Sequence, residues 1–427
     1  MKDALFYRIV FAGFFMLPFE NFIIAPSSGW PALSPLVFLL ALVFRSTKFS
    51  LDRKEVIVLL FGFTLSCLGW SVSENIGGGN RNFFGDVVGG LTPLLLGLCF
   101  YRVMTVVLSD RGFFKASLDF FFWGSVVALI ASIVILVFGY LLKVGFFIEF
   151  LGFILKRNHE MYRFSFLFAE PSFVSVHVLG VLVPFAWISW RLDYKLQFKR
   201  MLGVLFCYVL VALIFMDSAR FILDVVFLFF VVLFFYYSKS FLFLRSSKLF
   251  ALSLVFVFFV YVTSMNLELL EVVTFGRVSG GVDILSIVNS DPSLASRFFR
   301  TDAVYQALID NPIFMFTGVG FGNIGYLVDL GFYDASMNYM SNYTVEIDNI
   351  YLRGSGSNIF NMYARVVGEF GVLVALAVPL LLYSRRVAFL FFIVGWCYVQ
   401  FDSYAFYGVW IYLAVAGYFK KNMSASV

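Results

Sequence analysis

Long apolar stretches that follow one another constrain this chain more than any other feature. Of its 427 residues, 61% are hydrophobic and only 13% are charged, and the mean hydropathy is +0.92. A soluble protein of this length could not cover so much apolar surface with so little charge. Many stretches approach the ~20 residues that a helix needs to cross ~30 Å of hydrocarbon. Because helices satisfy their own backbone hydrogen bonds in lipid, the sequence predicts an all-α polytopic membrane protein.

We expect about twelve transmembrane helices, separated by short joints that are basic or rich in turn-forming residues. The apolar stretches lie near residues 5–25, 30–44, 55–73, 87–108, 118–142, 170–190, 201–216, 219–237, 249–265, 358–382, 387–401 and 404–419. We interpret the first stretch as a retained span rather than a signal peptide, because no small-residue cleavage site follows it.

The basic residues predict the orientation of these spans. If the N-terminus is cytoplasmic, the short inner joints hold most of the 31 Lys and Arg residues, as the positive-inside rule requires. Both termini are then expected in the cytoplasm. The formal charge of +5 gives no reason to expect a nucleic-acid partner, because the basic residues lie mostly at helix ends.

One long segment, residues 267–357, is polar enough to live in water. It divides the chain into residues 1–266 with nine spans, an external loop domain, and residues 358–427 with three spans. Residues 296–310 of the loop have helical spacing, and Asn311 with Pro312 ends the pattern.

Three glycines follow that expected helix, at positions 318, 320 and 322. A phosphate-binding fingerprint would need a strand before it, and no strand is evident. We therefore interpret the three glycines as a tight turn.

The cysteines and histidines suggest neither a disulfide framework nor a metal centre. The four cysteines lie inside apolar stretches and have no metal-ligand spacing. His159 lies in a loop, and His177 lies within a span, where a packing role is the more frequent one. We therefore expect no metal and no cofactor.

Arginines on the expected outer side are the main chemical signal. Arg220 and Arg365 lie in apolar surroundings, where an unpaired cation costs at least ~2.5 kcal/mol. Each has a carboxylate four residues later, Asp224 and Glu369, and the alternative to a functional role is a purely structural ion pair. Guanidinium groups bind phosphate oxygens in a bidentate way, whereas some outer arginines commonly serve only as solvated or headgroup contacts. The outer set comprises Arg163, Arg220, Arg297, Arg300, Arg353 and Arg365.

Glu170 is the strongest carboxylate candidate. It precedes Pro171 at the start of a span, a position suited to a first helical turn. One interpretation is a charge that the helix dipole favours. The other is a base at the outer membrane face, within reach of Arg163.

Three motifs, in this order along residues 163–371, resemble the bacterial O-antigen and exopolysaccharide repeat-unit polymerases, which are relatives of the O-antigen ligases. RFSFLFAEPS resembles their Arg…Glu-Pro-Ser element, and FMDSARFIL resembles an element that points to Arg220. SRFFRTDAVYQALIDNPIFMFTGVGFGN followed by SNIFNMYARVVGEFG resembles the loop helix, the glycine turn and the entry to the next span. The chain departs from the pattern at Ser165, where a glycine is usual. Ser357 and Asn358 stand where the ligases show His-Asn, which favours a polymerase.

The resemblance implies a GT-C-like, metal-independent glycosyltransferase at the periplasmic face of the bacterial inner membrane. Its donor and acceptor would be undecaprenyl-pyrophosphate-linked glycans, and its partners the bilayer and a chain-length regulator protein. Two alternatives from the same reasoning stay open: an O-antigen ligase that decorates lipid A core, and a lipid-linked oligosaccharide flippase or other transporter.

The resemblance also implies roles for individual residues. Glu170, Arg220 and Arg297 are the expected catalytic residues, with Glu170 as general base. Asp217 and His159 remain alternatives for that base. The expected pyrophosphate-binding residues are Arg163, Arg220, Arg297 and Arg300, and the expected supporting residues are Asp217, Asn358, Arg365 and Glu369. The 267–357 loop would form a lid or one wall over the site.

Overall fold

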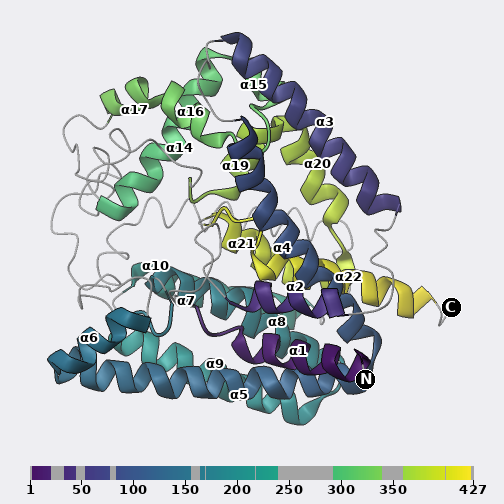
Figure 1. Cartoon of the computed structure of the whole chain (residues 1–427), viewed down its shortest axis with the longest axis vertical. Helices are drawn as coiled ribbons and strands as arrows, with labels where there is room; N and C mark the ends of the chain where they lie inside the picture. The colour runs from purple at the N-terminus through teal and green to yellow at the C-terminus, as the bar shows by residue number, and fades with distance from the viewer. Residues whose placement is uncertain are drawn as a thin grey trace.

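The computed structural model describes residues 2–20, 33–44, 53–76, 83–154, 164–168, 170–216, 218–238, 292–338, 359–399 and 401–424. Within these ranges the chain is all-helical and has no β-strand. Its helices form two groups, each with an apolar core of its own (Figure 1). Both termini lie on one side of the molecule, and α6, α7 and α14 lie at the other.

The larger group consists of apolar helices that pack side by side. α1 packs on α2 and α5, and α4 packs on α2 and on α22 near the C-terminus. Its members are α1 (Lys2–Met16), α2 (Ser34–Phe44), α4 (Phe83–Ser109), α5 (Arg111–Ile135), α6 (Gly145–Ile154), α7 (Pro171–His177), α8 (Val183–Arg191), α9 (Lys195–Phe215), α10 (Ala219–Ser238), α21 (Ala388–Val399) and α22 (Tyr407–Ser424).

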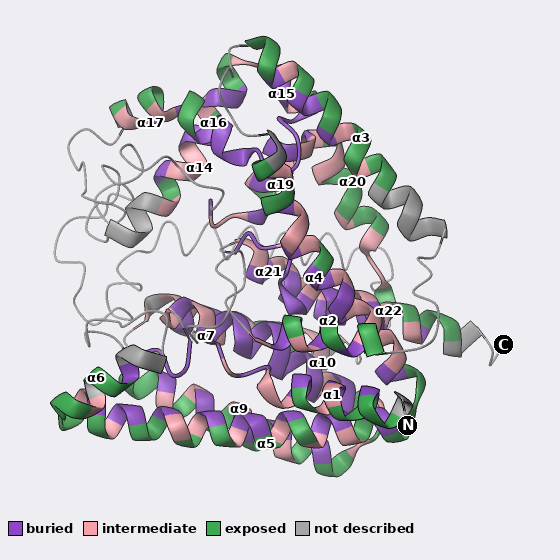
Figure 2. Ribbon diagram, in the orientation of Figure 1, coloured by how far each residue is buried: buried purple, intermediate pink, exposed green. Residues whose placement is uncertain are grey.

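Several of these helices are long and apolar enough to cross a membrane. Four such stretches lie in the described part of the chain: Val87–Ser109, Arg111–Leu141, Pro171–Arg191 and Lys195–Phe215. A fifth is present if the pair Val372–Leu382 and Arg385–Val399, bent by 78°, counts as one span. Large apolar side chains such as Leu60 on α3 (Arg53–Ile76) and Leu380 on α20 (Val372–Leu382) are exposed. Both helices carry exposed stretches, drawn green in Figure 2. Such surfaces are expected where helices face lipid.

The stretch Pro171–Arg191 is the axis of this group. In its apolar window 89% of the residues are buried, against 22 to 50% in the other three spans. It runs as α7, a π-helical turn η2 (Val178–Leu182), and α8. Gly180 in η2 lies so close to the Phe406 ring that a Cβ there would collide with it. The π-turn therefore packs directly against the segment that leads into α22, and such turns recur at functional sites.

The smaller group is built from the described part of the long loop. α14 (Pro292–Asp310) is the helix expected over residues 296–310, with an earlier start. Phe299, Ala303 and Ala307 are completely buried on one face of it, whereas Tyr305 is exposed. The group is completed by α15 (Phe314–Thr317), α16 (Ile324–Leu330), α17 (Phe332–Asn338) and α19 (Met362–Phe370).

The three glycines form the expected tight turn between α15 and α16. Gly318, Gly320 and Gly322 have φ values of 64°, 92° and 80°, which residues with a Cβ rarely adopt. The backbone N–H of Val319 donates to the Gly368 carbonyl at 2.8 Å, and that of Gly320 donates to the Glu369 carbonyl at 3.1 Å. The turn is thus fixed to the end of α19.

The span expected over residues 358–382 is not one straight helix. Gly371, with φ 84°, separates α19 from α20, and its N–H donates to the Val367 carbonyl at 2.8 Å, which ends α19 in a left-handed residue. α19 packs against α14, α15 and α16. It therefore belongs to the smaller group.

Candidate functional site

Glu170 lies at the N-cap of α7, directly above the buried axis. Its backbone is extended, and its side chain makes no capping hydrogen bond to the first turn. Ser172 Oγ donates to Glu170 Oε2 at 3.3 Å. The preceding residues 164–168 form a turn closed by the Phe168 N–H, which donates to the Ser165 carbonyl at 3.0 Å. The carboxylate is therefore presented at the end of a span rather than used as a cap.

Arg297 of α14 reaches that carboxylate. Its Nη2 lies 3.8 Å from Glu170 Oε2, and the two side chains are 20% and 29% exposed. The contact joins the smaller helix group to the start of α7. Because the side chains of Arg297 and Glu170 are both partly exposed, a ligand can reach them.

The ring of Phe360 lies close to the guanidinium groups of both α14 arginines, Arg297 and Arg300. The Cζ atoms of Arg297 and Arg300 lie 5.0 Å and 5.6 Å from the centroid of the Phe360 ring. Phe360 has φ 58°, a left-handed conformation that costs a residue with a bulky side chain about 1–3 kcal/mol. Neighbouring contacts must stabilise it, and they begin at Ile359.

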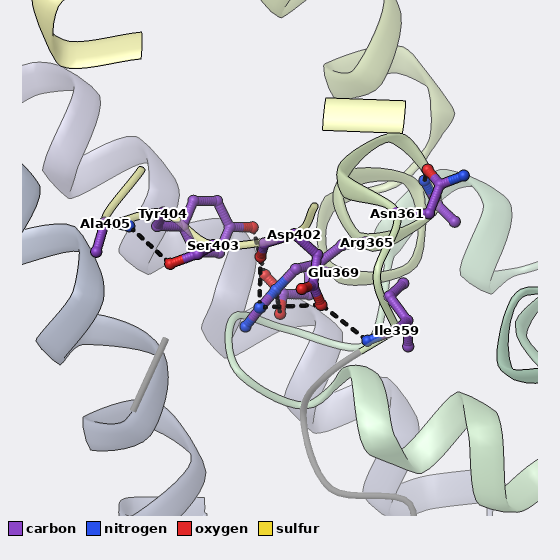
Figure 3. A network of polar contacts seen from close by, with 9 residues as sticks. Ile359, Asn361, Arg365, Glu369, Asp402, Ser403, Tyr404 and Ala405 are labelled. Carbon is purple, nitrogen blue, oxygen red and sulfur yellow. Dashed lines mark hydrogen bonds and ion pairs between the residues drawn. The ribbon is translucent and has the colours of Figure 1, made fainter. Parts of the chain in front are cut away.

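A buried network supplies those contacts (Figure 3). The Ile359 backbone N–H donates to Asp402 Oδ2 at 2.8 Å. Arg365 Nη1 donates to the Asp402 carbonyl at 2.8 Å and lies 3.6 Å from Asp402 Oδ2. Arg365 Nε donates to Glu369 Oε1 at 3.0 Å, and Tyr404 Oη donates to Glu369 Oε2 at 2.6 Å. The expected Arg365–Glu369 pair is present, and its members are almost fully buried.

Arg220 is held by a second buried carboxylate. Its Nε lies 3.5 Å from Asp224 Oδ2, as the four-residue spacing predicts. Asp224 also accepts hydrogen bonds from Ser175 Oγ of α7 and from Trp396 Nε1 of α21. The pair therefore fixes the first turn of α10 against both neighbouring helices.

Each of the three polar clusters contacts α7 or its N-cap, directly or through a neighbouring residue. Glu170 contacts Arg297, Ser175 contacts Asp224, and the ring of Phe173 lies 5.8 Å from that of Phe401, the residue before Asp402. Arg297 of α14 contacts the partly exposed Glu170 carboxylate, whereas Arg220 and Arg365 pair with the buried carboxylates of Asp224, Glu369 and Asp402. Such an arrangement can bind an anion near the end of a membrane span and can accept a proton there.

Some of the expected site residues have a position in this site and others do not. Glu170, Arg297 and Arg300 lie together, and Arg220 is linked to them through α7. Arg365 and Glu369 belong to the buried network, which suits support rather than contact with a ligand. Arg163, Asp217 and Asn358 lie outside the described residues, as do His159, Arg353 and Ser357.

His177 packs as expected. It is fully buried, and its ring lies 5.0 Å from that of Phe168 and 6.3 Å from those of Phe121 and Tyr208. Among the described residues, neither of its ring nitrogens has a hydrogen-bond partner.

Sequence reasoning missed Asp402 and Phe360. Asp402 is a single carboxylate between two apolar stretches, which is the same signal that singled out Arg365, so it could have been found. Phe360 carried no signal, because 59 phenylalanines are spread through the chain.

The described residues contain no group of three or more His, Cys, Asp and Glu side chains that could hold a metal ion. Metal independence therefore remains a prediction. Comparison with models of protein families, with characterised proteins and with solved structures found no match to this chain.

Proposed function

We propose that this protein is a repeat-unit polymerase of the O-antigen polymerase type. It joins undecaprenyl-pyrophosphate-linked oligosaccharides into a long polysaccharide at the periplasmic face of the bacterial inner membrane. The proposal includes about twelve spans, a GT-C-like arrangement and cytoplasmic termini. The single observation that carries it is the contact of 3.8 Å between Arg297 and Glu170, because it sets a cation that suits phosphate beside a carboxylate that suits a proton.

The reaction follows from those two groups. A sugar hydroxyl of the acceptor attacks the anomeric carbon of the donor, and the bond from that carbon to the pyrophosphate oxygen breaks. The lipid-linked pyrophosphate leaves with the bonding electrons, and the hydroxyl proton passes to the Glu170 carboxylate. Arg297 and Arg300, with Arg220 and Arg163, stabilise the charge that develops on the leaving group.

The position of the pair also supports this proposal. Glu170 directly precedes the span Pro171–Arg191, whose residues are mostly buried, and Arg297 belongs to the polar loop. A lipid-linked substrate places its pyrophosphate at the membrane surface, where these two elements meet. The loop forms one wall of the site, and the start of α7 forms the other.

The direct test uses purified protein in detergent, a lipid-linked repeat unit, and electrophoresis of the products. Wild-type protein should lengthen the glycan. Arg297→Ala should lower the rate about 100-fold or more, the cost of losing one charge-stabilising donor. Arg111→Ala changes an exposed arginine at the start of α5 and should not lower the rate. If Arg297→Ala and Arg220→Ala gave wild-type glycan ladders in a polymerase-null strain, the assignment would be wrong.

The phenotype of a null strain distinguishes a polymerase from the two alternative functions, a ligase and a flippase. Loss of a polymerase leaves lipid A core that carries single units. Loss of a ligase leaves lipid-linked polymer and undecorated core, and loss of a flippase leaves the substrate on the cytoplasmic leaflet. Either of the last two results would contradict the proposal.

Arginine can take the place of a metal ion on a leaving pyrophosphate. We therefore expect undiminished lengthening when EDTA is present in the assay with purified protein. Activity that EDTA abolishes and a divalent ion restores would contradict this expectation.

A further inference from the structure

Phe360 occupies an unusual position for an aromatic residue beside two cations. It lies three residues after the end of the polar loop, and both α14 arginines lie within cation–π distance of its ring, at 5.0 Å and 5.6 Å. Arg297 and Arg300 are three residues apart and so lie on the same side of α14. Like charges at this spacing repel each other, and Glu170, 3.8 Å from Arg297, offsets the charge of only one of the two.

The residue before Phe360 is fixed by buried contacts. Ile359 is fully buried in the core of the smaller group, and its N–H donates to the Asp402 carboxylate, which also pairs with Arg365. These contacts stabilise the left-handed backbone of Phe360. A backbone in a sparsely populated conformation persists only where its surroundings determine it, and such residues cluster at ligand-binding sites.

A guanidinium group that packs against a ring directs its five N–H donors outward in its own plane, where they can bind an anion. Two such groups beside one ring offer donors to two adjacent phosphate groups. From this geometry we propose that Phe360 is a positioning residue that holds Arg297 and Arg300 together as a binding site for a pyrophosphate group. The identity of the anion rests on the proposed function, whereas the role of the ring does not.

The experiment measures binding of inorganic pyrophosphate to the purified full-length protein by calorimetry in detergent. Phe360→Leu keeps apolar volume and removes the ring, and it should weaken binding about 10-fold, the loss expected for two cation–π contacts. Phe360→Trp restores a ring and should bind within about 3-fold of wild type. A purely structural role would not separate leucine from tryptophan in this way.

Two further variants control for folding and for loss of any ring. Phe360→Gly relieves the strained backbone, so it should unfold no earlier than Phe360→Leu and still bind weakly. Phe122→Leu removes the ring beside Arg200, at 5.3 Å on the opposite group of helices, and should leave pyrophosphate binding unchanged. If wild type fails to bind pyrophosphate, or if Phe360→Leu binds as wild type does, the proposal is overturned.

The outcome is independent of glycan transfer. Ring-dependent binding in a protein that does not lengthen lipid-linked glycan would sustain the role of Phe360 and reject the polymerase. Lengthening that is unaffected in Phe360→Leu, with unchanged binding, would sustain the polymerase and reject the role of Phe360.

Discussion

The Asp402 carboxylate contacts both Ile359, which lies just after the long loop, and Arg365 of α19. Its Oδ2 accepts the Ile359 N–H at 2.8 Å and lies 3.6 Å from Arg365 Nη1. One carboxylate between α21 and α22 thus fixes both the residue that follows the loop and the helix that comes after it. The ring that accompanies the two α14 arginines depends on this contact.

The first prediction concerns that carboxylate. Asp402→Asn leaves Arg365 without one of its two charged partners, and removal of one member of a buried ion pair typically costs about 3–5 kcal/mol. We expect a clearly lower Tm in detergent. Asp310→Asn changes an exposed carboxylate at the end of α14 and should leave the Tm unchanged. Equal Tm values for the two variants would contradict a structural role for Asp402.

The second prediction separates the two roles given to Glu170. The carboxylate lies 3.8 Å from Arg297 and competes with phosphate for it. Glu170→Gln should therefore strengthen the binding of inorganic pyrophosphate about 2–5-fold, as the loss of a partly exposed pair implies. It should also lower kcat by a factor of about 100 or more, because the general base is lost.

Glu149→Gln, an exposed glutamate of α6, is the matched control for Glu170→Gln. It should change neither the binding constant nor kcat. A kcat for Glu170→Gln close to that of wild type would assign the proton to another group, of which Asp217 and His159 are the candidates.

The third prediction assigns Asp224 to the positioning of Arg220. Asp224→Asn removes the charge that lies 3.5 Å from the guanidinium, so lengthening should fall at least about 10-fold. Asp224→Glu keeps the charge and should retain more activity. Asp334→Asn changes an exposed carboxylate of α17 and should have no effect. A role in folding alone would lower the amount of protein in the membrane without changing kcat per molecule.

The fourth prediction concerns the glycine turn. A Cβ on Gly320 would lie 2.7 Å from the Ser66 carbonyl, at a φ of 92° that side chains rarely adopt. Gly320→Ala should therefore lower the Tm by more than any glycine change made in open space. Gly203→Ala lies within α9 with no atom near its Cβ. It should raise the Tm slightly, because alanine favours the helix over glycine by about 0.5–1 kcal/mol.

The local patterns of the sequence predicted several contacts correctly. The spacing of Arg365 and Glu369, and of Arg220 and Asp224, predicted two ion pairs, because residues four apart share a helix face. The glycine string predicted a turn, because repeated glycines favour positive φ. The all-helical class followed from apolar length alone.

Long-range relationships were beyond such patterns. The spacing of Asp402, Tyr404 and Trp396 does not predict which helix they face. The hydrogen bonds from Arg365 to Asp402 and from Trp396 to Asp224 span 37 and 172 residues, and they depend on how whole helices pack. The break at Gly371 was missed for another reason. Hydropathy carries no information about a change in backbone direction. It therefore predicted one span over residues 358–382, although α19 packs with the loop helices.

A Cβ on Gly69 of α3 would collide with the Gly320 backbone, and a Cβ on Gly320 would collide with Trp70 of α3. Beside them, Ser66 Oγ accepts the Phe321 N–H at 3.2 Å. The glycine turn therefore lies with its bare backbone against an apolar helix that carries exposed leucines and phenylalanines. Any opening of α14 and α16 away from Glu170 must either break this backbone contact or carry α3 along through the surrounding lipid. In the proposed polymerase, the viscosity and thickness of the bilayer would then affect the rate at which a lipid-linked glycan enters between α14 and Glu170.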